Sequence, residues 1–228
     1  MASNQRVQAR IGQRALLLTT AVLPLTGWTL HALVLHRRVA AARKDPLTGL
    51  LGRPELLAYG DRLLRTGRRD ALRVLLLDAD GFKEVNDTYG HAAGDAVLRT
   101  IGCRLARWTA GRQALAVRLG GDEFALVTVL PTDSGLADIA ALREQLQQPL
   151  HHGRLTLQLD LSIGIACAAD LPGEDTSRIL RGADTSMYKV KTGEEEFPYL
   201  ATRADAYTET VNGRRTGRPG AHLPVPAA

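Results

Sequence analysis

Two adjacent carboxylates follow a pair of glycines near the middle of the chain. The stretch is Arg118-Leu119-Gly120-Gly121-Asp122-Glu123-Phe124, and it lies between the apolar runs 114–117 and 125–130. Two short β-type runs separated by a glycine-rich break predict a hairpin, because glycine accepts the backbone angles of a tight turn. Adjacent acids in such a turn repel each other, so we expect a bound cation, and a divalent metal is the natural candidate. A solvated acidic hairpin tip is the alternative.

A further carboxylate, Asp78, ends an apolar run over 71–79 that predicts a buried strand. Strand ends are where α/β proteins usually place their ligands. If this strand pairs beside the hairpin, Asp78 and Asp122 face each other across the sheet edge. Hard oxygen ligands of this type suit Mg²⁺. Two such ions ~3.5–4 Å apart would activate an attacking hydroxyl and neutralise a leaving pyrophosphate.

The segment 81–95 after Asp78 is rich in Gly, Asn and Asp, and it predicts a loop that wraps a phosphate with backbone N–H groups. Asn86 and Asp95 together can read a guanine edge, because an amide serves the carbonyl side and a carboxylate accepts from the ring N–H and the exocyclic amine. Taken alone, Asn86 has a plainer interpretation as a turn residue and Asp95 as a helix cap.

The elements that position these residues follow from the apolar periodicity. It predicts, in chain order, a helix over 54–64, a strand over 71–79, a helix over 94–109, the hairpin, a helix over 137–146, a strand or strand pair over 155–168 and a helix over 176–191. The order α-β-α-β-β-α-β-α is typical of a mixed α/β (α+β) domain with a hairpin at its centre. No internal repeat is visible.

The N-terminal region has a different character. A polar arm over 1–14 precedes 21 residues, 15–35, that contain no acid, Lys or Arg, and a basic stalk over 36–44 follows. A membrane-spanning helix needs ~20 such residues, so the run predicts a single span, although Pro24, Gly27 and His31 weaken the pattern. A cleaved signal peptide fits less well, because no small-residue cleavage site closes the run. A buried amphipathic helix would need a polar face.

Composition limits the remaining classes. Of the 228 residues, 45% are hydrophobic, as in an ordinary globular protein, and the formal net charge is +5. The excess of positive charge lies toward the two ends and aromatic residues for base stacking are scarce, so we expect no nucleic-acid partner. From 196 to 228 the chain offers too little apolar surface to order itself, which predicts a flexible tail.

Five segments in order carry a family resemblance. They are Asp45-Pro46-Leu47-Thr48-Gly49-Leu50, the run from Asp78 to Asp95, Gly120 to Phe124, Leu161-Ser162-Ile163-Gly164-Ile165-Ala166, and Ala183-Asp184-Thr185-Ser186-Met187-Tyr188. Over about two thirds of its length the chain resembles the GGDEF-domain diguanylate cyclases. The resemblance implies a catalytic domain over 45–195 with a palm-like, mostly antiparallel central sheet flanked by helices. The implied reaction joins two GTP molecules into cyclic di-GMP and releases two pyrophosphates.

The resemblance also implies roles for individual positions. The metal ligands would be Asp78, the backbone carbonyl of Ala79, and Asp122, holding two Mg²⁺ ions per site, with Mn²⁺ as an alternative. Asp122 or Glu123 would help to deprotonate the ribose 3′-hydroxyl. The implied substrate-binding positions are Asn86 and Asp95 for guanine and Phe82, Lys83 and Lys191 for the phosphates.

One subunit of this family binds one GTP, so the resemblance implies a homodimer. Because nucleoside triphosphates are cytoplasmic, we expect a single-pass inner-membrane protein with its catalytic domain in the cytoplasm. The stalk or the membrane helix could then control dimerisation.

The chain departs from the family pattern in three places. Members with product feedback carry Arg-x-x-Asp ending five residues before the glycine pair, where this chain has Gly111-Arg112-Gln113-Ala114, so we expect no feedback through this site. After Lys191 the family usually continues with Gly-Arg-Asn, and here Gly193-Glu194-Glu195-Glu196 brings acids toward the triphosphate. Gly52 replaces a common Asn. The second departure motivates an alternative, a catalytically degenerate domain that binds nucleotides or other proteins.

Overall fold

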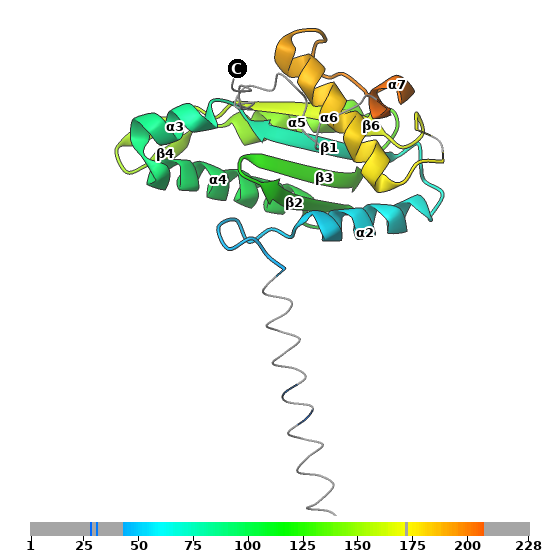
Figure 1. The fold of residues 1–228 in the computed structure, drawn as a ribbon, viewed down its shortest axis with the longest axis horizontal. Helices are drawn as coiled ribbons and strands as arrows, with labels where there is room; N and C mark the ends of the chain where they lie inside the picture. Colours follow the sequence, from blue (N-terminus) through cyan, green and yellow to red (C-terminus); the bar gives the residue numbers. More distant parts are fainter. Residues whose placement is uncertain (1–27, 29–30, 32–42, 172, 208–228) are drawn as a thin grey trace, which may run out of the picture. The chain divides into compact units, whose positions relative to one another are not determined.

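The computed structural model describes Trp28, His31 and residues 43–171 and 173–207 (Figure 1). The chain divides into two compact units, 1–44 and 45–228, and the second contains all the predicted site residues. Among the described residues, no helix is long and apolar enough to cross a membrane. The predicted arm and the predicted span over 15–35 lie outside these residues, apart from Trp28 and His31.

A four-stranded antiparallel sheet forms the centre of the second unit (Figure 1). Its order is β2-β3-β1-β6, with the bounds β1 Leu72–Ala79, β2 Ala114–Gly120, β3 Glu123–Val129 and β6 Leu161–Cys167. The two central strands have almost no exposed residues, which explains why their sequences are continuous apolar runs. The predicted α+β fold with a mostly antiparallel sheet is confirmed.

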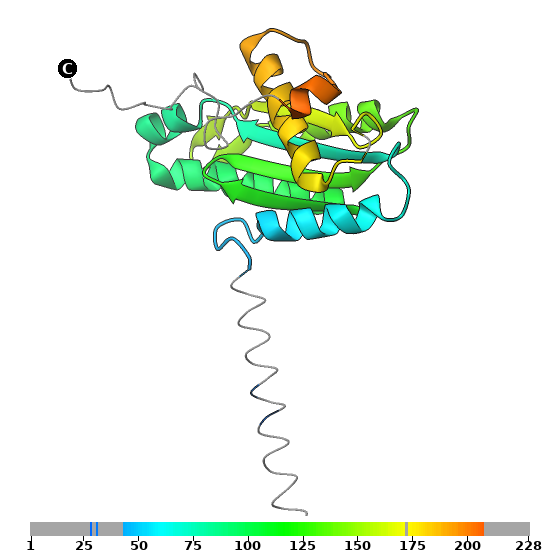
Figure 2. The same cartoon turned by 45° about the vertical axis from the view of Figure 1, so that its right-hand side comes forward.

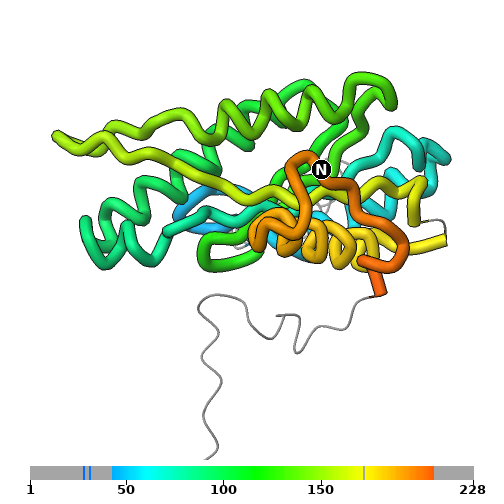
Figure 3. The backbone as a smooth tube through the Cα atoms, turned by 90° about the horizontal axis from the view of Figure 1, so that it is seen from above, coloured from blue at the N-terminus to red at the C-terminus, as the bar shows by residue number. Residues whose placement is uncertain are grey.

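Helices cover both faces of this sheet (Figures 1 and 2). On one face α4 (His91–Thr109) and α5 (Gly135–Gln147) contribute to a core that includes Leu75 and Leu77 of β1. On the other face α2 (Arg53–Leu64) and α6 (Thr176–Thr192) pack in a core with Val74 and Leu76. Successive β1 side chains thus alternate between the two cores, as the period of a strand requires. The view from above shows the two helical layers (Figure 3).

The prediction of a loop over 81–95 is wrong. This segment forms α3 (Phe82–Tyr89) and the first turns of α4, separated by Gly90 at φ +82°. Phe82 and Val85, three residues apart, pack on the first core, and this short apolar spacing was hidden by the polar composition. The structure also separates β4 (Leu150–His152) and β5 (Leu155–Leu157) from β6 as a two-stranded ribbon.

Close contact between α6 and β6 depends on one glycine. A methyl group at Gly164 would lie 2.0 Å from the carbonyl oxygen of Ala183 and 2.3 Å from the backbone nitrogen of Met187. Any larger residue would therefore push α6 away from the sheet. Gly164 belongs to one of the segments that carry the family resemblance, and the structure gives its physical reason.

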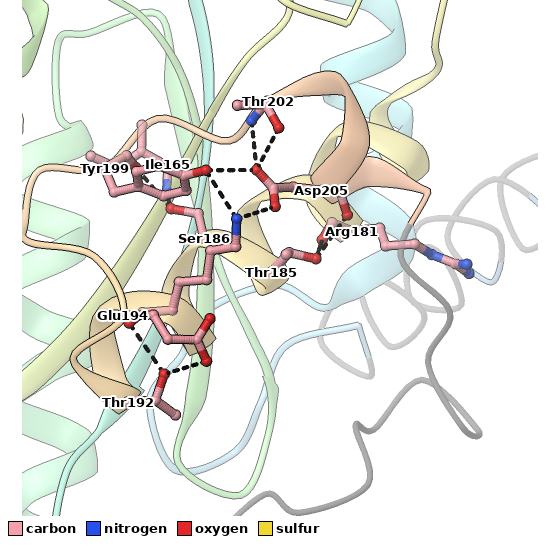
Figure 4. A network of polar contacts seen from close by, with 10 residues as sticks. Ile165, Arg181, Thr185, Ser186, Thr192, Glu194, Tyr199, Thr202 and Asp205 are labelled. Atoms are coloured by element: carbon pink, nitrogen blue, oxygen red, sulfur yellow. Dashed lines mark hydrogen bonds and ion pairs between the residues drawn. The ribbon is translucent and has the colours of Figure 1, made fainter.

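The predicted flexible tail over 196–228 differs from the structure in its first part. Residues 193–207, which we term the C-terminal segment, dock along α6 and β6 and end in the short helix α7 (Arg203–Ala206) (Figure 4). Leu200 pairs in parallel with Ile165, and the Ala201 N–H donates to the Ile165 carbonyl at 2.8 Å. Residues beyond 207 lie outside the described part.

Polar contacts order this segment together with the buried Ala201 and Ala206 and the partly buried Phe197 and Leu200, which pack on the two cores. The carboxylate of Asp205, 2% exposed, accepts hydrogen bonds from the backbone and hydroxyl of Thr202 and from the Tyr199 hydroxyl, and it pairs with Lys189 at 2.8 Å (Figure 4). These hydrogen bonds and Lys189 hold the pKa of Asp205 below its ordinary value in spite of burial. A compositional argument about apolar surface could not foresee this network.

Candidate active site

Pairing of β1 with β3 brings the predicted carboxylates to one edge of the sheet. Asp78 lies directly opposite Glu123, and the Ala79 N–H donates to the Asp122 carbonyl at 3.2 Å. Gly120 (φ +142°) and Gly121 (φ +53°) form the turn that carries Asp122 to the tip. The structure therefore brings together Asp78, Ala79, Asp122 and Glu123, the four residues for which metal binding or base catalysis was predicted.

The electrostatics of this edge are unbalanced. Asp78 is 5% exposed, and Asp122 is half-buried. Burial and the charge of Asp78 raise the pKa of Asp122, with Glu123 adding to the effect. Like charges held directly opposite each other in a sheet are unfavourable, so this edge attracts cations.

Lys191 supplies one cation from the last turn of α6. Its ammonium forms an ion pair with Asp78 and a second with Asp80, the latter at 2.7 Å. Burial alone would lower the pKa of Lys191, but the hydrogen bonds to these two carboxylates outweigh burial and raise it. The predicted substrate-binding lysine is thus at the carboxylate edge, although it is 113 residues from Asp78 in sequence.

Asp80 is a site residue that was not predicted. It follows Asp78 by two positions, and the strand period places residues i and i+2 on the same side of a strand. The Ser162 hydroxyl on β6 donates to both carboxylate oxygens of Asp80, at 3.0 and 2.8 Å. The alternation signal was available in the sequence, but the partners of Asp80 come from distant segments.

The donor set fits Mg²⁺ of the kind that binds together with a nucleotide. Within the part of the chain that the structure describes, no group of three or more His, Cys, Asp and Glu side chains forms a self-sufficient metal site. Mg²⁺ bound beside a phosphate commonly uses only one or two carboxylates and completes its shell with substrate oxygens and water. Asp78, Asp122 and the carbonyl of Ala79 are such a partial set, and the raised pKa of Asp122 indicates negative charge in need of a cation.

The predicted phosphate-binding residues Phe82 and Lys83 begin helix α3. Gly81, in the left-handed region at φ +67°, turns the chain out of β1 and caps this helix. The Phe82 side chain packs on the core, so only its backbone N–H is available to an anion, whereas Lys83 is exposed. The first N–H groups of a helix attract anions, and this replaces the loop that the sequence predicted.

Asn86 and Asp95 come from the two adjoining helices α3 and α4. The Asn86 amide oxygen lies only 2.1 Å from where a methyl group at Gly94 would be, so the glycine makes room for this side chain beside the start of α4. Asp95, 47% exposed, pairs with Arg99 at 3.1 Å through one oxygen. Its other oxygen is available to a ligand, and Arg99 is a neighbour that the sequence did not indicate.

Arg118 connects the hairpin to the start of the domain. Its guanidinium donates to both oxygens of Asp45, at 3.0 and 2.9 Å, and to the Gly121 carbonyl at 2.7 Å. Asp45 also accepts from the backbone and hydroxyl of Thr48, and these contacts lower the pKa of Asp45 although burial opposes them. Arg118 lies 73 positions from Asp45 in the sequence, so local pattern does not indicate this contact.

The acidic residues after Lys191 lie at the end of α6. Gly193 (φ +76°) terminates the helix, and all three glutamates that follow are exposed. The Glu194 N–H donates to the Lys189 carbonyl at 2.9 Å, and its carboxylate accepts from the Thr192 hydroxyl at 3.1 Å (Figure 4). The predicted departure from the family pattern is therefore near the lysine that was expected to bind phosphate.

A separate pocket of about 660 Å³ lies at the opposite ends of β1 and β3 from the carboxylates. Arg112 and Gln113, from the segment where family members with feedback carry Arg-x-x-Asp, line it together with Arg68, Asp70 and Asp138. It is lined by none of the predicted site residues. The candidate site is therefore located by its carboxylates and Lys191 and not by this pocket.

Comparisons with known proteins agree with this geometry. A family model described as diguanylate cyclase, GGDEF domain, matches residues 42–196, more than half of the chain. An uncharacterised 19.3 kDa protein of Streptomyces ambofaciens is 45% identical over 170 residues, which cover 75% of this chain and 90% of that protein. Diguanylate cyclase DgcZ of Escherichia coli is 34% identical over 181 residues, covering 78% of this chain and 58% of its own length.

A solved structure shares the fold as well. The GGDEF domain of PA1120 (TpbB or YfiN) from Pseudomonas aeruginosa is 34% identical and superposes with a TM-score of 0.63, covering 71% of this chain and 96% of that domain. The ordered segments, the sheet with its carboxylate edge, and the match to the family model agree. The chain belongs to the family of GGDEF-domain diguanylate cyclases.

Proposed function

We propose that this protein is an active diguanylate cyclase that condenses two GTP molecules into cyclic di-GMP and two pyrophosphates. The observation that carries the proposal is the carboxylate edge, where Asp78 lies opposite Glu123, Asp122 is at the hairpin tip and Lys191 reaches in from α6. Both glycines and both acids of the signature are present. The relationship to DgcZ of E. coli supports the same activity.

The reaction requires two matched displacements. In each, the ribose 3′-oxygen of one GTP forms a bond to the α-phosphorus of the other, and the bond from that phosphorus to the bridging oxygen of pyrophosphate breaks. The proton of the 3′-hydroxyl leaves to Asp122 or Glu123, or to water beside them. Burial raises the pKa of Asp122, which makes it a better proton acceptor than an ordinary aspartate.

Substrate binding is divided among three elements. Asn86 and Asp95 recognise the guanine edge, and the first turn of α3 with Lys83 meets the phosphates. Lys191 meets the phosphates from the other side. We propose that Mg²⁺ binds Asp78, the Ala79 carbonyl and Asp122, two ions per site, with Mn²⁺ able to replace it. When bound, these ions stabilise the negative charge on the attacking oxygen and on the leaving pyrophosphate.

Two copies of the chain are needed, because one domain holds one GTP and the product contains two. We propose a symmetric homodimer whose two carboxylate edges face each other. We further propose that residues 15–35 anchor the protein in the inner membrane and that the catalytic domain lies in the cytoplasm, where GTP is available. Membrane fractionation of cells that express the full chain tests the anchor.

Incubation of the purified full chain with GTP and Mg²⁺ tests the activity, with cyclic di-GMP and pyrophosphate measured separately. We expect equal amounts of pyrophosphate and incorporated GMP. Activity per subunit should rise with protein concentration if a dimer is required. Absence of cyclic di-GMP at saturating GTP, Mg²⁺ and protein would contradict the proposal.

A second candidate is a domain that binds nucleotide without catalysis. The exposed acids Glu194, Glu195 and Glu196 favour it, because they repel a triphosphate at the end of α6 where the family usually has an arginine. This candidate predicts GTP binding without turnover. Replacement of Glu194 by Arg should then strengthen binding of GTP, and it would raise turnover only if the remaining machinery is intact.

A further inference from the structure

Lys191 is held by two carboxylates, and only one of them belongs to the proposed metal site. Its ammonium contacts Asp78, a proposed Mg²⁺ ligand, and Asp80 at 2.7 Å. The Lys191 side chain is 27% exposed, and so is that of Asp80, so this second pair is at the mouth of the site and not in the core. Asp80 has no role in the reaction as described so far.

Several contacts fix the position of Asp80. The Ser162 hydroxyl donates to both carboxylate oxygens of Asp80. The backbone N–H of Asp80 donates to the Asp160 carbonyl at 3.0 Å. Asp160 in turn accepts from the side chain of Gln147 on α5. The Ser162 hydroxyl therefore orients the carboxylate of Asp80, and the Asp160 carbonyl holds its backbone.

The contacts of Asp80 argue against a role as a metal ligand. One of its oxygens is shared between Lys191 and Ser162, and the other also accepts from Ser162. A divalent ion at Asp78 would compete with Lys191 for the same carboxylate, since like charges cannot share it at close range. Asp80 offers the ammonium a second partner that does not depend on Asp78.

We propose that Asp80, oriented by Ser162, is a positioning residue that keeps the Lys191 ammonium beside the triphosphate while Asp78 binds Mg²⁺. An ammonium has three donors, and a pair with Asp80 alone leaves two of them for phosphate oxygens. Because the geometry is set by a hydrogen-bonded carboxylate, the long lysine side chain loses less conformational freedom when the nucleotide binds. The inference rests on the proposed function, since it assigns a step in binding of GTP and Mg²⁺.

A double-mutant cycle in the full chain tests this role by binding rather than by turnover. The dissociation constant of the non-hydrolysable α,β-methylene analogue of GTP is measured with Mg²⁺ for the wild type, Asp80→Asn, Lys191→Met and the double variant. We expect Asp80→Asn to weaken binding about five- to tenfold in the wild type and less than twofold in the Lys191→Met background. Asp170→Asn, an exposed residue with the same change of charge, is the matched control and should leave binding unchanged.

Ser162→Ala provides a second test that alters no charge. If Ser162 orients Asp80, this variant should weaken binding two- to fivefold, and again only when Lys191 is present. Thermal melting shows whether each variant folds. If Asp80→Asn does not fold, Ser162→Ala alone tests the positioning role of Asp80.

The possible outcomes are distinct. If Asp80→Asn weakens binding of the analogue equally with Lys191 and with Lys191→Met, or if it tightens binding, the positioning role is overturned. The cyclase proposal is unaffected by either result. A wild-type protein that does not bind the analogue at all contradicts the proposed function itself, and with it the role of Asp80.

Discussion

Two lysines on the same helix, two residues apart, have opposite surroundings. Lys189 faces one buried carboxylate, Asp205, which already accepts hydrogen bonds from Tyr199 and Thr202. Lys191 faces two carboxylates, with the raised-pKa Asp122 close to them. At Lys189 the charges balance, and at Lys191 acids are in excess.

The difference separates a structural network from a binding site. A balanced and fully hydrogen-bonded pair can hold a chain segment in place, but it offers little to a ligand. An edge with more acids than cations is costly to fold, and it recovers that free energy when cations bind. Substitutions near Lys189 should therefore change stability, and those near Lys191 should change binding and catalysis.

The largest expected effect is at the acidic edge. Asp122→Asn should lower cyclase activity about 10³-fold, because it removes both a proposed metal ligand and a candidate base. Its melting temperature should stay the same or rise, since burial and Asp78 already disfavour the charge of Asp122. Product formation and thermal melting measure the two effects. Activity within tenfold of the wild type would show that the edge is not catalytic.

The next largest effect is expected at the ion pair of Lys189 and Asp205. Asp205→Ala should lower the free energy of unfolding by about 3 kcal/mol, because it leaves Lys189 and the Thr202 N–H without their buried partner. Urea denaturation measures the loss, and turnover per folded molecule should change less than twofold. The exposed control Asp170→Asn should stay within about 0.5 kcal/mol of the wild type. If Asp205→Ala loses no more stability than this control, the ion pair of Lys189 and Asp205 does not hold the C-terminal segment in place.

The same substitution at both lysines sharpens the comparison. Lys189→Met should cost about 1–2 kcal/mol of stability whether or not Mg²⁺ is present. Lys191→Met should show a larger stabilisation by Mg²⁺ than the wild type, because the ion replaces the lost positive charge beside Asp78. Thermal melting with and without Mg²⁺ measures both. If Mg²⁺ raises the melting temperature of both variants equally, Lys191 does not differ from Lys189 in its relation to the metal site.

The smallest expected effect is in the pH dependence of stability, to which the ionised forms of Asp205 and Asp122 contribute with opposite signs. The pKa of Asp205 is lowered from 3.8, so its contribution is complete above 3.8 and is lost as the pH falls through the lower, folded-state value. The pKa of Asp122 is raised from 3.8, so its charge destabilises the fold above the raised value, and this cost disappears below 3.8.

The two asparagine variants measure these signs. At pH 7, Asp205→Asn should be less stable than the wild type and Asp122→Asn should be as stable or more stable. Both differences should shrink when urea denaturation is repeated toward pH 3. If the difference in free energy of unfolding between either variant and the wild type grows toward pH 3, the direction assigned to the pKa shift of that aspartate is wrong.

Local pattern was sufficient for much of the fold. The apolar run predicted β1 to within one residue, and the glycine pair correctly marked the turn between β2 and β3. The prediction that Asp78 and Asp122 face each other across the sheet edge is off by one position, because the register places Glu123 opposite Asp78 and Asp122 beside Ala79 at the same edge. Helix α3 was missed because its eight residues contain only two core contacts among polar neighbours.

Contacts between distant segments could not be read from pattern. Asp80 contacts Ser162 and Lys191, and Arg118 contacts Asp45, although these partners are far apart in the sequence. Residues 196–207 were predicted to be part of a flexible tail because they offer little apolar surface. They are ordered by hydrogen bonds to Ile165, Ser186 and Lys189, whose positions depend on the docking of α6 at Gly164.

The sequence by itself determined most of the helices and strands, the family and the acids at the hairpin, since these depend on local propensity and on short ordered segments. Only the tertiary structure decided the partners of the two lysines on α6, which are Asp78 and Asp80 for Lys191 and Asp205 for Lys189. The physical reason is that charge balance depends on neighbours in space, and strands and helices far apart in the chain supply those neighbours.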